Sequence, residues 1–254
     1  MTEQTSKILG EIPGLQILNQ KESQQTVDVY VDLKSPHAYL AIRPSLELAR
    51  DFKVFVNFLP YTLSYVTLGV SSEVTDEMKR KPANAASDRK ARMYYAAARE
   101  YAKIQGLPFK SPYRLLDSSM ANIALLFAKR QSLEIPFLLK IYTSGWGSGW
   151  RDYELESVEA SREVLLECGA DLTGFEQYIS KDGAGLPELQ KYALQAEESG
   201  IAGVPHYVLK DDEKHKGLSL FGREHLALIR SRLSERGLAR DSSVEAAFSH
   251  TWPN

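Results

Sequence analysis

A serine, a proline and a histidine lie together where a strand pattern gives way to a helix pattern, at Ser35-Pro36-His37. Serine is a favoured N-terminal cap of a helix, and proline is favoured at the first helical position. The free N–H groups and partial positive charge of a helix N-terminus stabilise anions, and they lower the pKa of a thiol held there. The junction could therefore expose a bound thiolate to an electrophile, although the same residues also suit an ordinary helix start.

The residue types present exclude thiol–disulfide exchange by this junction itself. A Cys-x-x-Cys pair would place cysteines at Ser35 and Ala38, but the only cysteine of the chain is Cys168. Exchange requires an attacking thiolate and a resolving thiol. Cys168 stands before Gly169 at the end of a helical pattern, where we expect a small buried side chain.

The elements that would position Ser35 follow a strand–helix–strand order. Apolar and polar residues alternate from Val27 to Leu33, which predicts a strand. A helix is predicted over 37–50 and a second strand over 54–59. Such a unit implies parallel strands joined by a right-handed crossover.

The rest of the chain is predicted to be a block of helices followed by a hairpin. The expected helices cover 85–104, 119–130, 136–142, 158–168, 172–180 and 186–199, and Trp146 to Trp150 is predicted to be a loop. Strands at 206–209 and 218–221 then flank a charged, solvated turn at 211–216, and a last helix covers 224–233. The predicted fold is an α/β protein with the thioredoxin-like order βαβ…ββα and a large all-helical insertion.

This order divides the chain into four parts. We expect an N-terminal extension (1–26), a thioredoxin-like domain (27–60 and 201–234), a helical insertion (61–200) and a C-terminal tail (235–254).

Several stretches, taken in order, resemble the DsbA-like proteins. Within them the resemblance is to the branch of 2-hydroxychromene-2-carboxylate isomerases and kappa-class glutathione transferases. The stretches are Val27–Ala41, Lys90–Tyr94 with Gly106–Phe109, Trp146 with Arg151-Asp152, Gly203-Val204-Pro205 and Phe221–Glu224. The resemblance covers about 27–234, and it implies a DsbA-like fold, glutathione as cofactor and a homodimer.

The resemblance also implies roles for particular residues. Ser35 would hold the glutathione thiol, and a cis peptide at Val204-Pro205 would let Val204 pair with the glutathione backbone, whereas the alternative is an ordinary trans proline. Gly222-Arg223-Glu224 would hold the γ-glutamyl end, although the family has Gly-Ser-Asp there. His37 stands where that branch has tyrosine or phenylalanine. It is expected to act as a catalytic hydrogen-bond donor or proton carrier, or else to lie on the surface.

The substrate-binding candidates lie in the helical block. Arg89 and Arg92 are three residues apart and share a helix face, so with Tyr94 they could receive a carboxylate and an aromatic ring. Charges on an alanine-rich helix are also typical of a solvated face. Trp146, with Trp150, could line an aromatic pocket or pack the insertion against the sheet.

Composition narrows the function classes. The net charge of −2 gives no reason to expect nucleic acid or a membrane surface, and no run of about 18 apolar residues predicts a membrane span. The five histidines have no metal-like spacing, and no phosphate-binding glycine motif is present. The first residues lack the apolar core of a secretory signal, so we expect a cytoplasmic protein.

The combined prediction is a glutathione-dependent isomerase acting on an aromatic enone or chromene carboxylate. The implied mechanism is conjugate addition of a thiolate, bond rotation and elimination. One alternative is a kappa-type glutathione transferase. Another is a non-redox DsbA-like domain that binds a peptide or partner beside Val204.

Overall fold

The computed structural model describes residues 25–64, 76–77 and 85–246. Almost all of the expected N-terminal extension lies outside these residues, as does the end of the expected C-terminal tail. The proposed domain boundaries therefore stay predictions.

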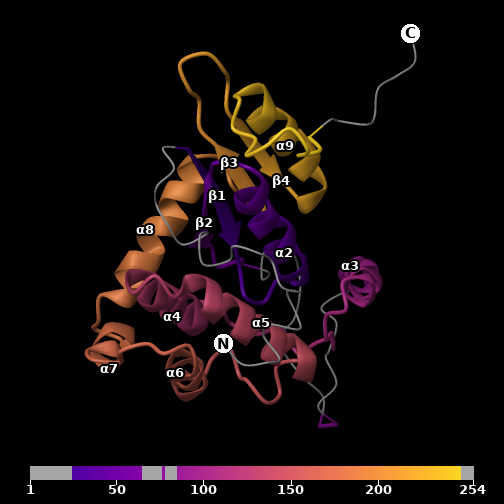
Figure 1. Ribbon diagram of the computed structural model, residues 1–254. Helices are drawn as coiled ribbons and strands as arrows, with labels where there is room; N and C mark the ends of the chain where they lie inside the picture. The colour runs from indigo at the N-terminus through magenta and orange to yellow at the C-terminus, as the bar shows by residue number, and fades with distance from the viewer. Residues whose placement is uncertain (1–24, 65–75, 78–84, 247–254) are drawn as a thin grey trace.

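A four-stranded sheet in the order β2-β1-β3-β4 forms the centre of the molecule (Figure 1). Strand β1 (Thr26–Val31) pairs in parallel with β2 (Phe55–Pro60) and antiparallel with β3 (His206–Leu209). Strand β3 also pairs antiparallel with β4 (Leu218–Phe221). Helix α2 (Pro36–Asp51) joins β1 to β2, which confirms the predicted strand–helix–strand unit.

Helices fill the chain between β2 and β3. They are α3 (Ala85–Ile104), α4 (Ser119–Arg130), α5 (Glu134–Ser148), α6 (Val158–Glu167), α7 (Phe175–Ile179) and α8 (Gly185–Glu198). After β4, the short 3-10 turn η3 (Arg223–His225) leads into α9 (Leu226–Glu235). The predicted thioredoxin-like order with a helical insertion is confirmed.

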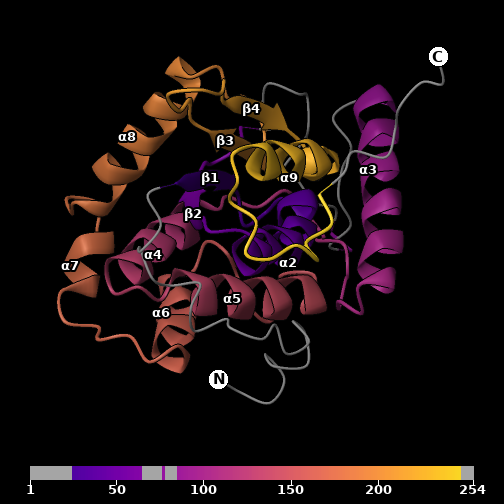
Figure 2. The ribbon, with the colours of Figure 1, turned by 45° about the horizontal axis from the view of Figure 1, so that its top comes forward.

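The sheet has a helical layer on each side (Figure 2). Helices α2 and α9 cover one face, where Val29 of β1 and Tyr207 of β3 are fully buried. The hydroxyl groups of Tyr207 and Ser45 of α2 lie 3.1 Å apart and share a hydrogen bond inside this layer. Helices α4 and α8 lie toward the other face. Burial of these apolar side chains supplies most of the stabilisation of the sheet.

Helix α5 corrects the prediction of a loop at Trp146 to Trp150. The helix continues through Ser148, so only Gly149 and Trp150 of the predicted loop lie outside it, and Gly149 has a φ of 68°. Gly145, just before this stretch, allows close packing, because a Cβ there would lie 2.2 Å from the Trp150 ring, and Gly149 makes the left-handed turn that ends the helix. Trp150 itself adopts a φ of 61°, which turns its side chain back onto the helix.

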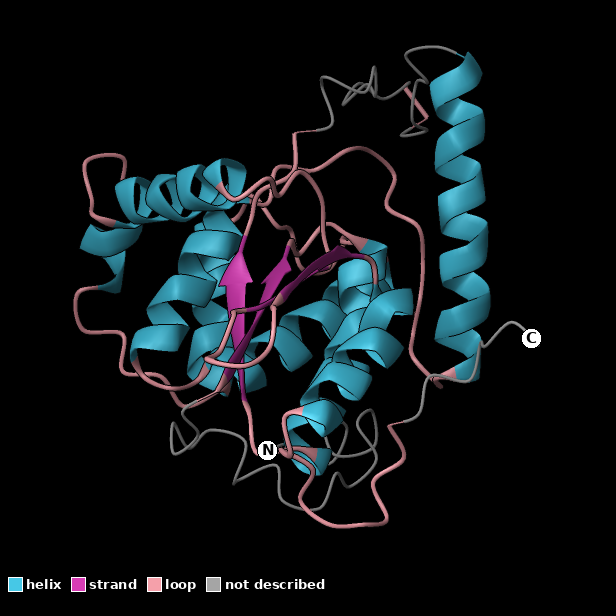
Figure 3. Cartoon of the chain, turned by 90° about the horizontal axis from the view of Figure 1, so that it is seen from above, coloured by secondary structure: helices cyan, strands magenta, loops and turns pink. Residues whose placement is uncertain are grey.

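Helix α3 lies beside α2 at the edge of the molecule, as all three ribbon views show (Figures 1, 2 and 3). Of its 20 residues only Asp88, Ala98 and Ala102 are buried. The two alanines pack on Leu40 of α2 in a small apolar cluster separate from the main core. The helix therefore presents most of its surface to solvent.

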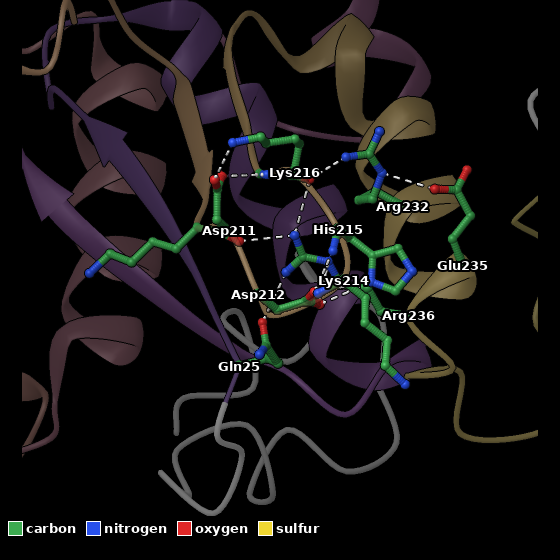
Figure 4. Close-up of polar contacts among 11 residues, drawn as sticks. Gln25, Asp211, Asp212, Lys214, His215, Lys216, Arg232, Glu235 and Arg236 are labelled. Atoms are coloured by element: carbon green, nitrogen blue, oxygen red, sulfur yellow. Dashed lines mark hydrogen bonds and ion pairs between the residues drawn. The ribbon is translucent and has the colours of Figure 1, made fainter.

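The charged turn between β3 and β4 is predicted to be a solvated loop, and the structure ties it to α9 (Figure 4). Arg236 donates hydrogen bonds to the carbonyls of Lys210 (2.9 Å) and Lys216 (3.2 Å) at the two ends of the turn. Asp212 accepts from the backbone N–H of Lys214 at 2.8 Å, which lowers the pKa of this carboxyl to about 2. Asp212 also lies 3.2 Å from Arg236.

Replacing Arg236 with glutamine is expected to destabilise the protein by about 2 kcal/mol. The guanidinium is 2 % exposed, and its loss removes charge-assisted hydrogen bonds to both ends of the turn. Urea unfolding measures the change. Lys214→Gln in the same turn is the control, since its exposed side chain points away from the network in Figure 4 and should stay within about 0.5 kcal/mol of the parent. Equal effects of the two changes would contradict this role of Arg236.

Candidate functional site

Ser35 caps the N-terminus of α2. Its backbone is extended (φ −89°, ψ 118°), and its Oγ accepts a hydrogen bond from the N–H of Ala38 at 3.3 Å. Pro36 occupies the first turn, as predicted. The side chain is only 3 % exposed, and no group in the described ranges accepts the hydroxyl proton of Ser35. The hydroxyl is thus able to donate to an anion at the helix N-terminus.

Asp32 anchors the turn that carries Ser35, and nothing in the local sequence pattern marks it as a site residue. This carboxylate is fully buried, accepts from the N–H of Leu63 at 2.7 Å and also accepts from the hydroxyl of Ser118. The ammonium of Lys34 lies 3.7 Å away and is also buried. The carbonyl of Asp32 accepts from the N–H of Ser35 at 2.9 Å. The turn is therefore held by the segment after β2, by the N-cap residue of α4 and by its own backbone.

The peptide bond between Val204 and Pro205 is cis, as the resemblance implied. Both residues are buried. Because β1 and β3 are antiparallel neighbours, with Tyr30 opposite His206, the segment after β1 and the segment before β3 meet at one edge of the sheet. Ser35 and Val204 come from these two segments.

The turn at Gly222 adjoins the cis-proline segment. The N–H of Gly222 donates to the carbonyl of Pro205 at 2.9 Å. Gly222 has a φ of 107°, which favours glycine, and a Cβ there would lie 2.4 Å from the carboxylate of Glu224. The side chain of Glu224 therefore folds back over Gly222.

His37 lies close to this turn and to α3. Its ring meets the ring of Tyr94 edge-on, with centroids 5.7 Å apart, and its Nε2 is buried without a hydrogen-bond partner. Burial and the positive charge of Arg223 lower the pKa of His37, and the charge of Glu224 opposes that effect. The structure thus brings His37, Tyr94, Arg223 and Glu224 together, and His37 is neutral at pH 7.

The lowered pKa of His37 predicts a pH dependence of stability. A group whose folded pKa lies below its unfolded value of about 6.5 stabilises the fold above that pH, and the contribution is lost as the pH falls through the folded pKa. We expect the free energy of unfolding to fall less between pH 7 and pH 5 in His37→Gln than in the parent. Urea unfolding at each pH measures it, and parallel curves for the two proteins would refute it.

Arg89 and Arg92 are not brought to this cluster. Arg92 forms an ion pair with Asp88 of its own helix, and its side chain is 78 % exposed. Arg89 is exposed. Of the three substrate-binding candidates on α3, Tyr94 alone has a described contact with the cluster, through His37. The helix face that the two arginines share is exposed to solvent. This agrees with the alternative interpretation of the sequence, in which these charges form a solvated face.

Trp146 is a buried packing residue of the helical insertion and does not line an open surface. It has no exposed area. Its ring stacks on Phe109 at 5.0 Å and on Tyr39 at 6.3 Å between centroids, and Trp150 meets it edge-on at 5.8 Å. The contact with Tyr39 of α2 joins the insertion to the helix that begins at Ser35. The expectation of a substrate-binding Trp146 gives way to the packing alternative.

Tyr101 is a member of the cluster that sequence reasoning missed. The guanidinium carbon of Arg223 lies 3.7 Å from the centroid of its ring. Tyr101 follows Tyr94 by seven residues, which is two helical turns, so both rings lie on one side of α3. That spacing was the signal available in the sequence.

Other features of the described residues lie away from this cluster. A groove of about 880 Å³ crosses the opposite face of the sheet, where its lining includes Asp28, Asn57, Lys129 and Tyr192.

Burial raises the pKa of Cys168 to about 11, which makes it a poor nucleophile. The described part of the chain holds no cluster of metal-ligating side chains. Nor does it contain a helix with the length and hydrophobicity needed to cross a bilayer.

Comparison with known proteins gives consistent relatives. A family model described as DSBA-like thioredoxin domain matches residues 26–234. A 2-hydroxychromene-2-carboxylate isomerase of Pseudomonas putida is 26% identical over 191 residues, covering 73% of this chain and 86% of the relative. An enzyme of the same name from Pseudomonas sp. (strain C18) is 25% identical over 189 residues, covering 73% and 82%.

Solved structures share the fold. A structure of 2-hydroxychromene-2-carboxylate isomerase superposes with a TM-score of 0.62 at 20% identity, covering 84% of this chain and 96% of the other. A probable DsbA oxidoreductase from Streptomyces coelicolor gives 0.61 at 16% identity, with 89% and 95% covered. At these identities the likeness concerns the fold.

Proposed function

This chain belongs to the family of DSBA-like thioredoxin domains, and from that premise we propose that it is a glutathione-dependent isomerase of an aromatic enone or chromene carboxylate. The observation that carries the proposal is the hydroxyl of Ser35. It caps α2 where redox relatives carry a cysteine, and it keeps a proton to donate. Relatives named 2-hydroxychromene-2-carboxylate isomerase, at about 25% identity, support the choice of reaction.

The residues at the sheet edge fit a bound thiolate tripeptide. Ser35 offers a hydroxyl donor to sulfur at the positive end of a helix. Val204, before the cis proline, offers backbone groups at the same edge. Glu224, exposed in the turn at Gly222, offers a negative charge for the ammonium group of the γ-glutamyl end. The chemistry that glutathione supplies when bound is a thiolate that adds reversibly to an enone and so permits rotation about its double bond.

His37 would act on the substrate. The imidazole is neutral at pH 7, and its buried Nε2 has no partner among the described residues. In the tautomer that carries the Nε2 proton, it can donate a hydrogen bond to a substrate carbonyl oxygen and stabilise the charge that develops there. Tyr94 meets this ring edge-on.

Calorimetry with glutathione, followed by an isomerisation assay on 2-hydroxychromene-2-carboxylate, tests the proposal. We expect glutathione to bind and isomerisation to require it. S-methylglutathione is the matched control, because it keeps the peptide but has no thiol, so it should bind and support no turnover. Absence of glutathione binding would refute the proposal. Conjugation of chlorodinitrobenzene without isomerisation would favour a kappa-type transferase instead.

The homodimer implied by the resemblance and the cytoplasmic location expected from the sequence both stay predictions. Analytical ultracentrifugation of the full chain tests the first, and a species of monomer mass at micromolar concentration would contradict it.

A further inference from the structure

The guanidinium of Arg223 is a cation whose hydrogen-bond donors are uncommitted. Within the described ranges it forms no hydrogen bond and no ion pair, and its one described contact is with the ring of Tyr101. The side chain is half-buried. Its five N–H donors, arranged in a planar fork, therefore remain available to an anionic ligand.

Tyr101 fixes the orientation of this fork. Its ring centroid lies 3.7 Å from the guanidinium carbon, the separation of two stacked planes. Stacking occupies one flat face of the guanidinium and leaves its edge open. That edge binds a carboxylate through two parallel hydrogen bonds.

The guanidinium of Arg223 lies beside the candidate site. Tyr94, two turns before Tyr101 on α3, contacts His37, and Arg223 lies near enough to His37 to lower the pKa of its imidazole. His37 follows Ser35 by two residues at the start of α2. A ligand held by Arg223 would therefore extend over His37 toward Ser35.

We propose that Arg223, laid flat on Tyr101, receives the carboxylate of an aromatic acid bound beside His37. The identity of the acid as an enone or chromene carboxylate rests on the proposed function. The assignment replaces Arg89 and Arg92. Arg92 is already paired with Asp88 and largely exposed, and neither arginine has a described contact with His37.

The charges around His37 favour an anion. From η3 they are Arg223 and Glu224, and α3 adds Lys90, whose ammonium lies 5.9 Å from the centroid of the Tyr94 ring. These three groups sum to one positive charge. Glu224 does not neutralise Arg223 by an ion pair in the described structure, because its carboxylate folds over Gly222.

Binding of 2-hydroxycinnamate to the full chain, without glutathione, tests the proposal by calorimetry and by NMR titration of His37. The amide 2-hydroxycinnamamide is the matched ligand without charge. We expect Arg223→Gln to weaken binding of the acid about 10- to 100-fold and to leave binding of the amide within about twofold. Arg92→Gln, the matched arginine of α3, should leave both unchanged.

The titration of His37 gives a second readout of the charge at Arg223, provided that circular dichroism shows the variant to be folded, because exposure of His37 would also raise its pKa. Removing the cation in Arg223→Gln should raise the pKa of His37, and binding of the acid to the parent protein should raise it as well. In Arg223→Gln the acid should cause little further change.

Tyr101 is a positioning residue in this scheme. Tyr101→Phe keeps the stacked ring and should keep the preference for acid over amide, whereas Tyr101→Ala should lose most of it. Circular dichroism checks that each variant is folded.

The outcomes separate this inference from the proposed function. The role of Arg223 is overturned if the acid does not bind the parent protein, or if it binds the Arg223→Gln variant with the affinity of the parent. Either result would count even if glutathione-dependent isomerisation is observed. Conversely, selective loss of acid binding in Arg223→Gln supports it even if glutathione does not bind.

Discussion

Replacing Ser35 with alanine is expected to lower kcat/KM for glutathione-dependent isomerisation about 100-fold or more. The hydroxyl is the donor that the structure leaves free at the N-terminus of α2. Removing one donor from an anion held in a site sheltered from water costs about 10² to 10³ in rate. Steady-state kinetics at saturating glutathione measures the loss, and calorimetry measures the accompanying change in affinity.

The control must separate the donor from the helix cap. Ser35→Ala also removes the hydrogen bond from the N–H of Ala38, which costs about 1 kcal/mol of stability. Ser35→Thr keeps both the hydroxyl and the cap and should retain most of the activity. Cys168→Ser should have no effect, because that thiol is half-buried with a raised pKa. Equal activity of the Ser35→Ala and Ser35→Thr proteins would contradict the role of Ser35.

The part of the site that could be predicted from the sequence rests on local chemistry. The N-cap serine and first-turn proline specify where α2 begins, and the structure starts the helix at Pro36. Alternation from Val27 specifies β1 because successive side chains of a strand point to opposite faces. Both signals act within a few residues, so one sequence suffices to read them.

The remaining features depend on partners that are distant in the sequence. Asp32 reads as one more polar residue of an alternating strand, but Leu63 and Ser118 bury it from 31 and 86 residues away. Arg223 reads as a departure from a family pattern, and only the placement of α3 shows that Tyr101 lies beneath it. Burial and orientation of charged groups follow from tertiary packing, which neither composition nor periodicity specifies.

Asp32→Asn is expected to destabilise the protein by about 3 kcal/mol, the largest stability effect that we predict. The carboxylate has no exposed surface, and the Lys34 ammonium beside it is 9 % exposed. Removing one partner of a buried ion pair leaves the other charge uncompensated, and this costs more than the pair contributes. Urea unfolding at pH 7 measures the change.

A neighbouring carboxylate provides the matched control. Asp28 lies on the same strand, is half-buried and accepts a hydrogen bond from Asn57 at 2.7 Å, without an ion pair among the described residues. Asp28→Asn should therefore cost about 1 kcal/mol or less. If the two substitutions lower the free energy of unfolding by similar amounts, the burial of Asp32 and its ion pair with Lys34 do not contribute to stability as proposed.

A double-mutant cycle with Lys34→Met identifies what the pair does for the site. If the cost of Asp32→Asn comes from a buried ammonium that has lost the Asp32 carboxylate, the double variant should be more stable than Asp32→Asn alone. Ser35 is tied to the carbonyl of Asp32, at 2.9 Å, and not to its carboxylate. The double variant should therefore recover kcat/KM together with stability. Recovery of stability without activity would instead mean that the charges themselves act on the anion that Ser35 holds.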